Sequence, residues 1–136
     1  MTAEENKAIF RRFMRELREG NLAIIDEVCS PDFQFHSPNF PNWPGGLEGA
    51  RTLATEGGRL IANGETTLDD FFAAEDRVVV RMTIRGTYVG DKSVAGFPKK
   101  GERFAMGAVA IYRMVDGKIV DDWGIQLACP TDTPWG

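Results

Sequence analysis

The sequence predicts an α+β fold, in which three N-terminal helices pack on one face of a strongly bent antiparallel sheet. Apolar residues recur at helical spacing up to about residue 61, whereas from Thr66 onward they follow the pattern of long strands. Asp116-Gly117 separates the last two strands, and this pair is typical of the type I′ turn that joins antiparallel neighbours. A bent sheet that cups helices encloses a cone-shaped cavity, and such pockets are usually apolar with a few polar groups.

Length and composition indicate one ordinary globular domain covering residues 1–136. The hydrophobic fraction of 43% and the charged fraction of 26% are not those of a disordered chain. Sixteen Lys and Arg against twenty Asp and Glu give a net charge of −4, which argues against a nucleic-acid partner. No apolar stretch approaches the ~20 residues of a membrane helix, and the first residues are acidic and polar, unlike a secretory signal. We therefore expect a cytoplasmic protein without a membrane partner.

Two helices are predicted before the first strand. Thr2 and Glu5 form a capping box, and apolar residues then recur at three- and four-residue spacing until Gly20 ends the helix. Asn21 can cap a second, shorter helix, which Pro31 closes. Both helices carry one apolar stripe, so both are expected to pack on the sheet.

The segment from residue 33 to residue 64 is predicted to contain a strand, a loop and the third helix. Residues 33–36 alternate like a short strand, and residues 37–46 contain three prolines that exclude regular structure. The pattern from 47 to about 61 is helical, although two glycines weaken it. Asn63-Gly64 is predicted to be a turn.

The remaining chain is predicted to form long antiparallel strands. They cover about 66–74, 78–88, 104–115 and 119–127. Both faces of the strand over 104–115 are apolar, so both are expected to be covered. A second copy of the sheet is one such cover, which predicts a homodimer. The alternative is a central strand of a curved sheet with one face on a cavity.

These elements resemble the SnoaL-like polyketide cyclases, which belong to the superfamily named after nuclear transport factor two. The resemblance covers nearly the whole chain, and five segments in the family's order carry it: residues 31–38, 46–49, 75–90, 96–101 and 116–123. The resemblance implies a cone-shaped α+β barrel that is dimeric or tetrameric. It also implies a small hydrophobic ligand, with no metal and no organic cofactor.

The resemblance implies an intramolecular aldol closure, which needs a base next to a carbonyl and a donor for the enolate. In these cyclases an aspartate follows the strand tryptophan by four residues, and here that position is Leu127. A histidine in a family turn is replaced by Tyr88. The chain thus departs from the family at its principal acid–base residue.

Three residues are the candidate catalytic groups. His36 matches a histidine that recurs in these cyclases, and the imidazole ordinarily titrates near neutral pH. Its alternative is a strand-end histidine held by a backbone carbonyl. Asp121 is the nearest substitute base if the Trp123 face of its strand lines the cavity, where burial would raise its pKa. A salt bridge to Arg81 or Arg85 is its alternative.

Tyr88 is the third candidate, as a hydrogen-bond donor to the developing oxyanion, with Tyr112 as the other choice. Large apolar side chains are expected to form the pocket wall, although most such residues in strands belong to a core. The predicted substrate-binding residues are Phe40, Trp43, Phe104, Met106, Tyr112, Trp123 and Leu127. Trp43 lies in the proline-rich loop and is well placed to cover a cavity.

Several other site types lack the residues that they need. A zinc site is not expected, because His36 is the only histidine and Cys29 and Cys129 are far apart in the sequence. Cys29 and His36 could form a nucleophilic pair, but a small buried thiol is the favoured interpretation. No phosphate loop or dinucleotide fingerprint is present, and without a Gly-x-Ser-x-Gly motif the sequence gives no support for a hydrolase triad.

Two functional hypotheses remain. The first is a cofactor-independent enzyme that performs acid–base chemistry on a small hydrophobic carbonyl compound, as a cyclase, isomerase or dehydratase. The second is a non-catalytic dimeric domain that binds a small molecule and has lost the family's catalytic aspartate.

Overall fold

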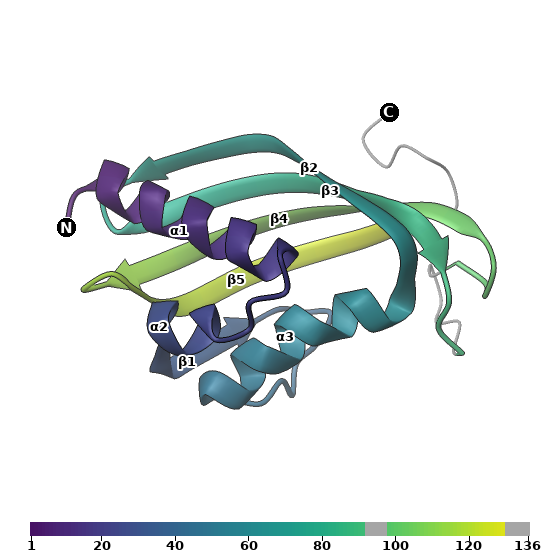
Figure 1. Cartoon of the computed structure of the whole chain (residues 1–136), viewed down its shortest axis with the longest axis horizontal. Coiled ribbons are helices and arrows are strands. Elements are labelled where there is room, and N and C mark those ends of the chain that lie inside the picture. The colour runs from purple at the N-terminus through teal and green to yellow at the C-terminus, as the bar shows by residue number, and fades with distance from the viewer. Residues whose placement is uncertain (92–97, 130–136) are drawn as a thin grey trace.

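The computed structural model describes residues 1–91 and 98–129 of the chain, and Figure 1 shows their arrangement. Helices α1 (Ala3–Arg18), α2 (Ile24–Val28) and α3 (Gly46–Leu60) lie on one side of a curved sheet. The predicted α+β class, with N-terminal helices on one sheet face, is therefore confirmed. Within the described residues, no helix combines the length and the apolar character needed to cross a membrane.

Five strands form one sheet in the order β1-β5-β4-β3-β2. In chain order they are β1 (Cys29–His36), β2 (Ile61–Ala74), β3 (Arg77–Tyr88), β4 (Arg103–Val115) and β5 (Lys118–Cys129). Four strands pair in antiparallel fashion, but β1 lies parallel to β5 at the edge. The sheet is therefore mixed, unlike the wholly antiparallel sheet that we expected, because no hairpin turn fixes the direction of β1 against β5.

The first helix begins at the predicted capping box. Glu5 N donates to Thr2 Oγ1 at 3.1 Å, and Thr2 N donates to Glu5 Oε1 at 3.1 Å. The predicted cap of the second helix is wrong, because α2 begins three residues after Asn21. The Asn21 side chain instead donates from Nδ2 to Glu16 Oε1 at 3.0 Å, so it is not available to cap α2.

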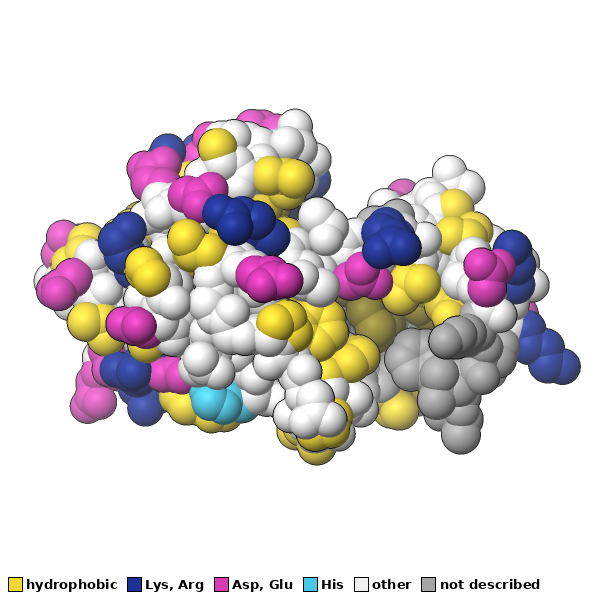
Figure 2. Space-filling model, turned by 90° about the horizontal axis from the view of Figure 1, so that it is seen from below, with side chains coloured by type: hydrophobic (Ala, Val, Ile, Leu, Met, Phe, Trp, Pro, Cys, Tyr) yellow, Lys and Arg dark blue, Asp and Glu magenta, His cyan; other side chains and the backbone are white. Residues whose placement is uncertain are grey.

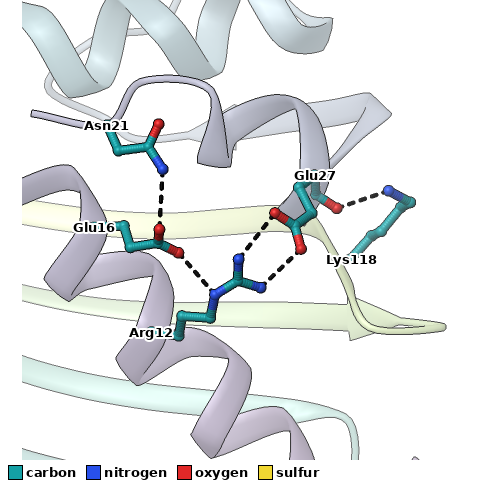
Figure 3. A network of polar contacts seen from close by, with 5 residues as sticks. All are labelled: Arg12, Glu16, Asn21, Glu27 and Lys118. Carbon is teal, nitrogen blue, oxygen red and sulfur yellow. Dashed lines mark hydrogen bonds and ion pairs between the residues drawn. The ribbon is translucent and has the colours of Figure 1, made fainter.

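A polar network fixes α1 to its neighbours. The Arg12 guanidinium pairs with Glu27 of α2 through two hydrogen bonds of 2.7 and 3.1 Å, and its Nε lies 2.7 Å from Glu16 Oε2. Lys118, at the start of β5, donates to the Glu27 carbonyl at 2.8 Å. Figure 3 shows these contacts joining α1, α2 and β5. They hold α1 at a set position over the sheet.

One predicted turn is confirmed and another is wrong. Asp116 and Gly117 have φ values of 50° and 77°, as a type I′ hairpin requires. Asn63-Gly64, however, lies inside β2, where the register with β3 shifts between Ala62 and Glu65. Asn63 adopts a φ of 54°, a left-handed conformation that asparagine tolerates. One such residue produces a bulge in a long strand rather than a chain reversal.

A second irregularity, in β5, decides which side chains face the helices. Arg113 pairs with Asp121, but Met114 pairs with Ile119, so Val120 is an extra residue in β5. A bulge of this kind interrupts the alternation of side chains. Ile119 and Asp122 therefore both face the helices, whereas Asp121 and Trp123 lie on the outer face of the sheet.

The core lies between α1 and the concave face of the sheet. Phe10 is fully buried and its ring centroid lies 4.5 Å from that of Tyr112 and 5.9 Å from that of Phe71. These contacts join α1 to β2 and β4. The neighbouring α1 residues Phe13 and Met14 lie beside a space that the core side chains do not fill.

Candidate functional site

A cavity of about 200 Å³ lies between the helices and the concave face of the sheet. Side chains from α1, β1, α3, β3, β4 and β5 line it, and most of them are apolar; Phe13, Leu17, Phe33, Leu53, Met82 and Ile84 are examples. The face of the molecule shown in Figure 2 is hollowed, and hydrophobic side chains gather in the hollow.

Asp122 is the carboxylate of this cavity. It projects inward from β5, and the residue is only 7% exposed to solvent. Its Oδ1 has no hydrogen-bond partner within the described part of the chain. Burial raises the pKa of Asp122 from its usual 3.8 to about 7, because the charged form loses its hydration. Near neutral pH this carboxyl can therefore either donate or accept a proton.

Tyr112 lies directly opposite Asp122 on the neighbouring strand β4 and lines the same cavity. Burial, together with the neighbouring Asp122 carboxylate, holds the pKa of Tyr112 well above its usual value. Its hydroxyl stays protonated at neutral pH and can donate a hydrogen bond. Side chains opposite one another in an antiparallel pair lie about 5 Å apart at Cβ, so Tyr112 and Asp122 are neighbours on the cavity face of the sheet.

Cys29 also lines the cavity, at the start of β1. Burial and the nearby Asp122 raise the pKa of the Cys29 thiol to about 12. The thiolate is the nucleophilic form of cysteine, so this residue is inert near neutral pH. Cys29 and His36 also lie at opposite ends of β1, and His36 is on the outer face. The structure therefore does not form the nucleophilic pair that the sequence left open.

We expect Cys29 to resist alkylation in the folded protein. With iodoacetamide at pH 8, Cys129, which is half-buried, should be modified first, and Cys29 should react only after urea unfolds the chain. Intact-mass and peptide mass spectrometry measure both sites. Modification of native Cys29 as fast as that of Cys129 would contradict the burial described here.

The candidate pair His36 and Asp121 is brought together, but on the outer face of the sheet. His36 Nε2 lies 2.8 Å from Asp121 Oδ1, and the His36 side chain is 42% exposed. Arg113 Nε donates to Asp121 Oδ2 at 2.8 Å. Although partial burial alone would raise it, hydrogen bonds from His36 and Arg113 lower the pKa of Asp121. The expected rise in this pKa is thus wrong, and the salt-bridge alternative holds, with Arg113 as partner.

Arg81 takes a different carboxylate from the one that the sequence suggested. Its Nε donates to Asp70 at 2.7 Å, and its Nη1 lies 3.7 Å from Asp69. Both acids lie on the neighbouring strand β2. Arg81 therefore joins β2 and β3 rather than reaching Asp121.

Trp123 accompanies His36 on the outer face. Their rings are stacked, with centroids 5.2 Å apart and planes 16° apart. A shallow apolar groove of about 250 Å³ runs beside them, lined also by Val109, Ile111 and Ile125. Trp123 therefore borders this outer groove and not the inner cavity, because the bulge at Val120 places it on the face opposite to Ile119.

Leu127 lies on the same outer face and is 59% exposed. Counting four residues from the tryptophan therefore leads to a position outside the cavity, and a leucine there does not bear on cavity chemistry. Gln126 faces inward and lines the cavity. Its amide offers a neutral hydrogen-bonding group on the same strand face as Asp122.

The other predicted site residues pack elsewhere among the described elements. Tyr88 and Phe104 pack edge-to-face at 6.1 Å in a second cluster with Met106. Phe40 and Trp43 form an aromatic group with Phe35. Apart from Phe35, none of these residues is among those that line the cavity. Their contact with a substrate stays a prediction.

The loop that carries Trp43 packs against the fold. The Trp43 indole donates to the Gly49 carbonyl at 3.0 Å, and a Cβ on Gly49 would come within 1.9 Å of the Pro44 carbonyl oxygen. Glycine is thus required at position 49 for the loop to lie against α3. Across residues 1–91 and 98–129, no group of three His, Cys, Asp or Glu side chains could hold a metal ion.

Comparisons with known proteins point in one direction. Residues 8–126 match the family model described as SnoaL-like polyketide cyclase. The structure of TsrD from Streptomyces laurentii is 27% identical, with a TM-score of 0.73 over 93% of this chain and 90% of that chain. AclR from Streptomyces galilaeus, described as a putative hydroxylase, is 24% identical, with a TM-score of 0.71 over 93% and 81% of the two chains.

A putative SnoaL-like polyketide cyclase from Jannaschia sp. CCS1 is 18% identical, with a TM-score of 0.76 over 91% of this chain and 86% of that chain. At this identity the likeness concerns the fold alone, as it does for AclR. A comparison with functionally curated proteins found no match.

Proposed function

The chain belongs to the SnoaL-like polyketide cyclase family, and from this premise we propose that it is a cofactor-independent acid–base enzyme acting on a small hydrophobic carbonyl compound. One observation carries the proposal: Asp122, a buried carboxyl with an unpartnered oxygen, projects into an apolar cavity. A buried acid whose pKa is about 7 is matched to proton transfer at neutral pH.

The chemistry requires two groups, and the cavity supplies both. Ionised Asp122 removes a proton from the carbon next to the carbonyl, and the electron pair moves onto the carbonyl oxygen to give an enolate. The Tyr112 hydroxyl donates a hydrogen bond to that oxygen, a contribution worth roughly 3 kcal/mol in comparable sites. The enolate carbon then attacks a second carbonyl, which closes a ring and leaves an alkoxide that takes the proton held by Asp122; in a conjugated enolate, a more distant carbon can take that proton instead, which moves the double bond.

Hydrogen–deuterium exchange tests this proposal without knowledge of the natural substrate. Acetophenone in D₂O should exchange its methyl protons in the presence of the protein, measured by ¹H NMR. The rate should rise with pH and level off above about pH 7, because the base is the ionised form of Asp122. Asp122→Asn should slow the exchange by roughly 10²-fold or more.

Two other outcomes would contradict either the position of the acid–base site or the catalytic function itself. If Asp121→Asn or His36→Ala abolishes exchange and Asp122→Asn does not, the His36–Asp121 pair on the outer face is the acid–base site. If acetophenone binds in the cavity without any protein-dependent exchange, the non-catalytic binding domain is the better description.

We also propose that a second copy of the chain covers the outer face of the sheet. Adjacent strands β4 and β5 present an exposed apolar patch there, formed by Val109, Ile111, Trp123, Ile125 and Leu127. Contiguous apolar patches on one face are typical of interaction sites. Charges of both signs border the patch, Arg77 over the Trp123 ring and the Arg113–Asp121 pair, so it is compatible with a copy of itself across a two-fold axis.

A further inference from the structure

We propose that the cavity selects neutral carbonyl compounds of about one ring and rejects both carboxylates and fused multi-ring frameworks. This inference rests on the proposed function for its reacting group, Asp122, but concerns which molecules the site accepts. Two independent observations carry it: the charges of the lining side chains and the volume that they enclose.

The residues that line the cavity in the described part of the chain include no positively charged side chain. None of them is a lysine, arginine or histidine, and the ionisable ones are Cys29, Tyr112 and Asp122. A ligand carboxylate would thus enter an apolar space that offers it no cation and already holds one carboxyl group. Two carboxylates at one site repel each other, and a buried unpaired charge is costly. The site therefore favours uncharged ligands.

The polar groups that are present suit a neutral oxygen instead. The protonated Tyr112 hydroxyl can donate a hydrogen bond, and the Gln126 amide can both donate and accept. Gln126 lies four residues beyond Asp122, so strand geometry separates their Cα atoms by about 13 Å. A ligand can place its carbonyl between Asp122 and Tyr112 and direct its other end towards Gln126.

The volume of the cavity lies between two reference values. A dry cavity of about 150 Å³ accepts benzene, whereas drug-sized ligands occupy pockets of about 300–1,000 Å³. On the scale on which the six carbon atoms of benzene occupy about 150 Å³, the 200 Å³ found here corresponds to roughly eight or nine non-hydrogen atoms. Bulky side chains from both layers set the limit, among them Leu17 of α1 and Met82 of β3. A single ring with a short substituent is close to this volume, whereas three fused rings exceed it and would have to extend out of the cavity.

A series of aryl methyl ketones and one matched acid test both halves of the inference by binding alone. At pH 8, calorimetric titration should give acetophenone at least a tenfold lower Kd than benzoate, which has the same shape but carries a charge. Asp122→Asn should narrow this ratio several-fold, because it removes the repelling carboxylate. Asp26→Asn, which removes an exposed carboxylate of α2 outside the cavity, should leave the ratio unchanged.

The same titrations with larger ketones test the size limit. Affinity should fall from acetophenone to 2-acetylnaphthalene and vanish for 2-acetylanthracene. Met82→Ala should raise the affinity for 2-acetylnaphthalene towards that for acetophenone. If this variant does not fold, Leu17→Ala enlarges the cavity from the helix side and provides the same test.

The outcomes separate this inference from the proposed function. Selective binding of acetophenone without proton exchange would retain the inference and overturn the catalytic proposal. Exchange combined with equal affinity for benzoate, or with binding of the three-ring ketone, would overturn the inference and retain catalysis. Failure of all four probes to bind would overturn the inference.

Discussion

Asp122→Asn is expected to make the protein more stable at pH 8, by up to about 4 kcal/mol, and to leave stability almost unchanged below about pH 4. Burial raises the pKa of Asp122 to about 7 in the folded state, whereas the unfolded value is close to 3.8. The shift spans roughly three pKa units, each worth about 1.4 kcal/mol.

The direction follows from where the proton is bound. Between about pH 4 and pH 7 the folded protein holds the Asp122 proton and the unfolded chain does not, so the free energy of unfolding falls as pH rises. Above about pH 7, Asp122 is ionised in both the folded and the unfolded state, and the loss of folding free energy is complete. Asparagine cannot ionise, so the variant avoids this loss and gains most at alkaline pH.

Urea denaturation of wild type and variant at several pH values from 4 to 8 measures the effect. Asp121→Asn is the matched control, because it makes the same chemical change one residue away on the outer face. Hydrogen bonds from His36 and Arg113 lower the pKa of Asp121, so its ionised form stabilises the fold above its unfolded pKa, and this is lost as pH falls. That variant should be less stable than wild type at pH 8. Equal or lower stability of Asp122→Asn at pH 8 would contradict the burial of an uncompensated carboxyl.

If the proposed dimer forms, Ile125→Glu is expected to convert it into a monomer, with association weakened by at least roughly a hundredfold. Ile125 is 62% exposed in a single chain and lies within the apolar patch of the outer face. Across a two-fold axis each substitution enters the interface twice, so two carboxylates would be buried without partners.

Sedimentation over a range of concentrations measures the association. Leu22→Glu is the control, because Leu22 is also an exposed apolar residue, at 47%, but precedes α2 on the helical side of the molecule. That variant should remain dimeric. A wild-type chain that sediments as a monomer at every concentration would overturn the proposal of a second copy on this face.

The fold could be predicted from the sequence because its elements are long and each one carries its own local signal. Thr2 and Glu5 mark the start of α1, and Asp116-Gly117 marks the last hairpin. The parallel placement of β1 could not be predicted in this way. It depends on contacts between segments about 90 residues apart, for which the local pattern contains no information.

The candidate site was harder to predict, for two different reasons. The outward direction of His36 could have been predicted from the sequence. Side chains alternate between the two faces of a strand, so a strand that buries Phe33 and Phe35 directs His36 to the opposite face. The inward direction of Asp122 could not be predicted, because the bulge at Val120 places Asp122 on the same face as Ile119, against regular alternation. The extra residue, Val120, is a β-branched residue typical of regular strands, so nothing at that position indicates a bulge.

The extra residue in β5 has a consequence for how the interior of this protein could change over evolution. If β5 had no bulge at Val120, the side chains after this residue would change faces of the sheet. The tryptophan and leucine would then fill the interior, and the acid and the glutamine would meet solvent. Loss of the one extra residue at this point would therefore fill the cavity with apolar side chains and bring Asp122 and Gln126 to the outer face of the sheet.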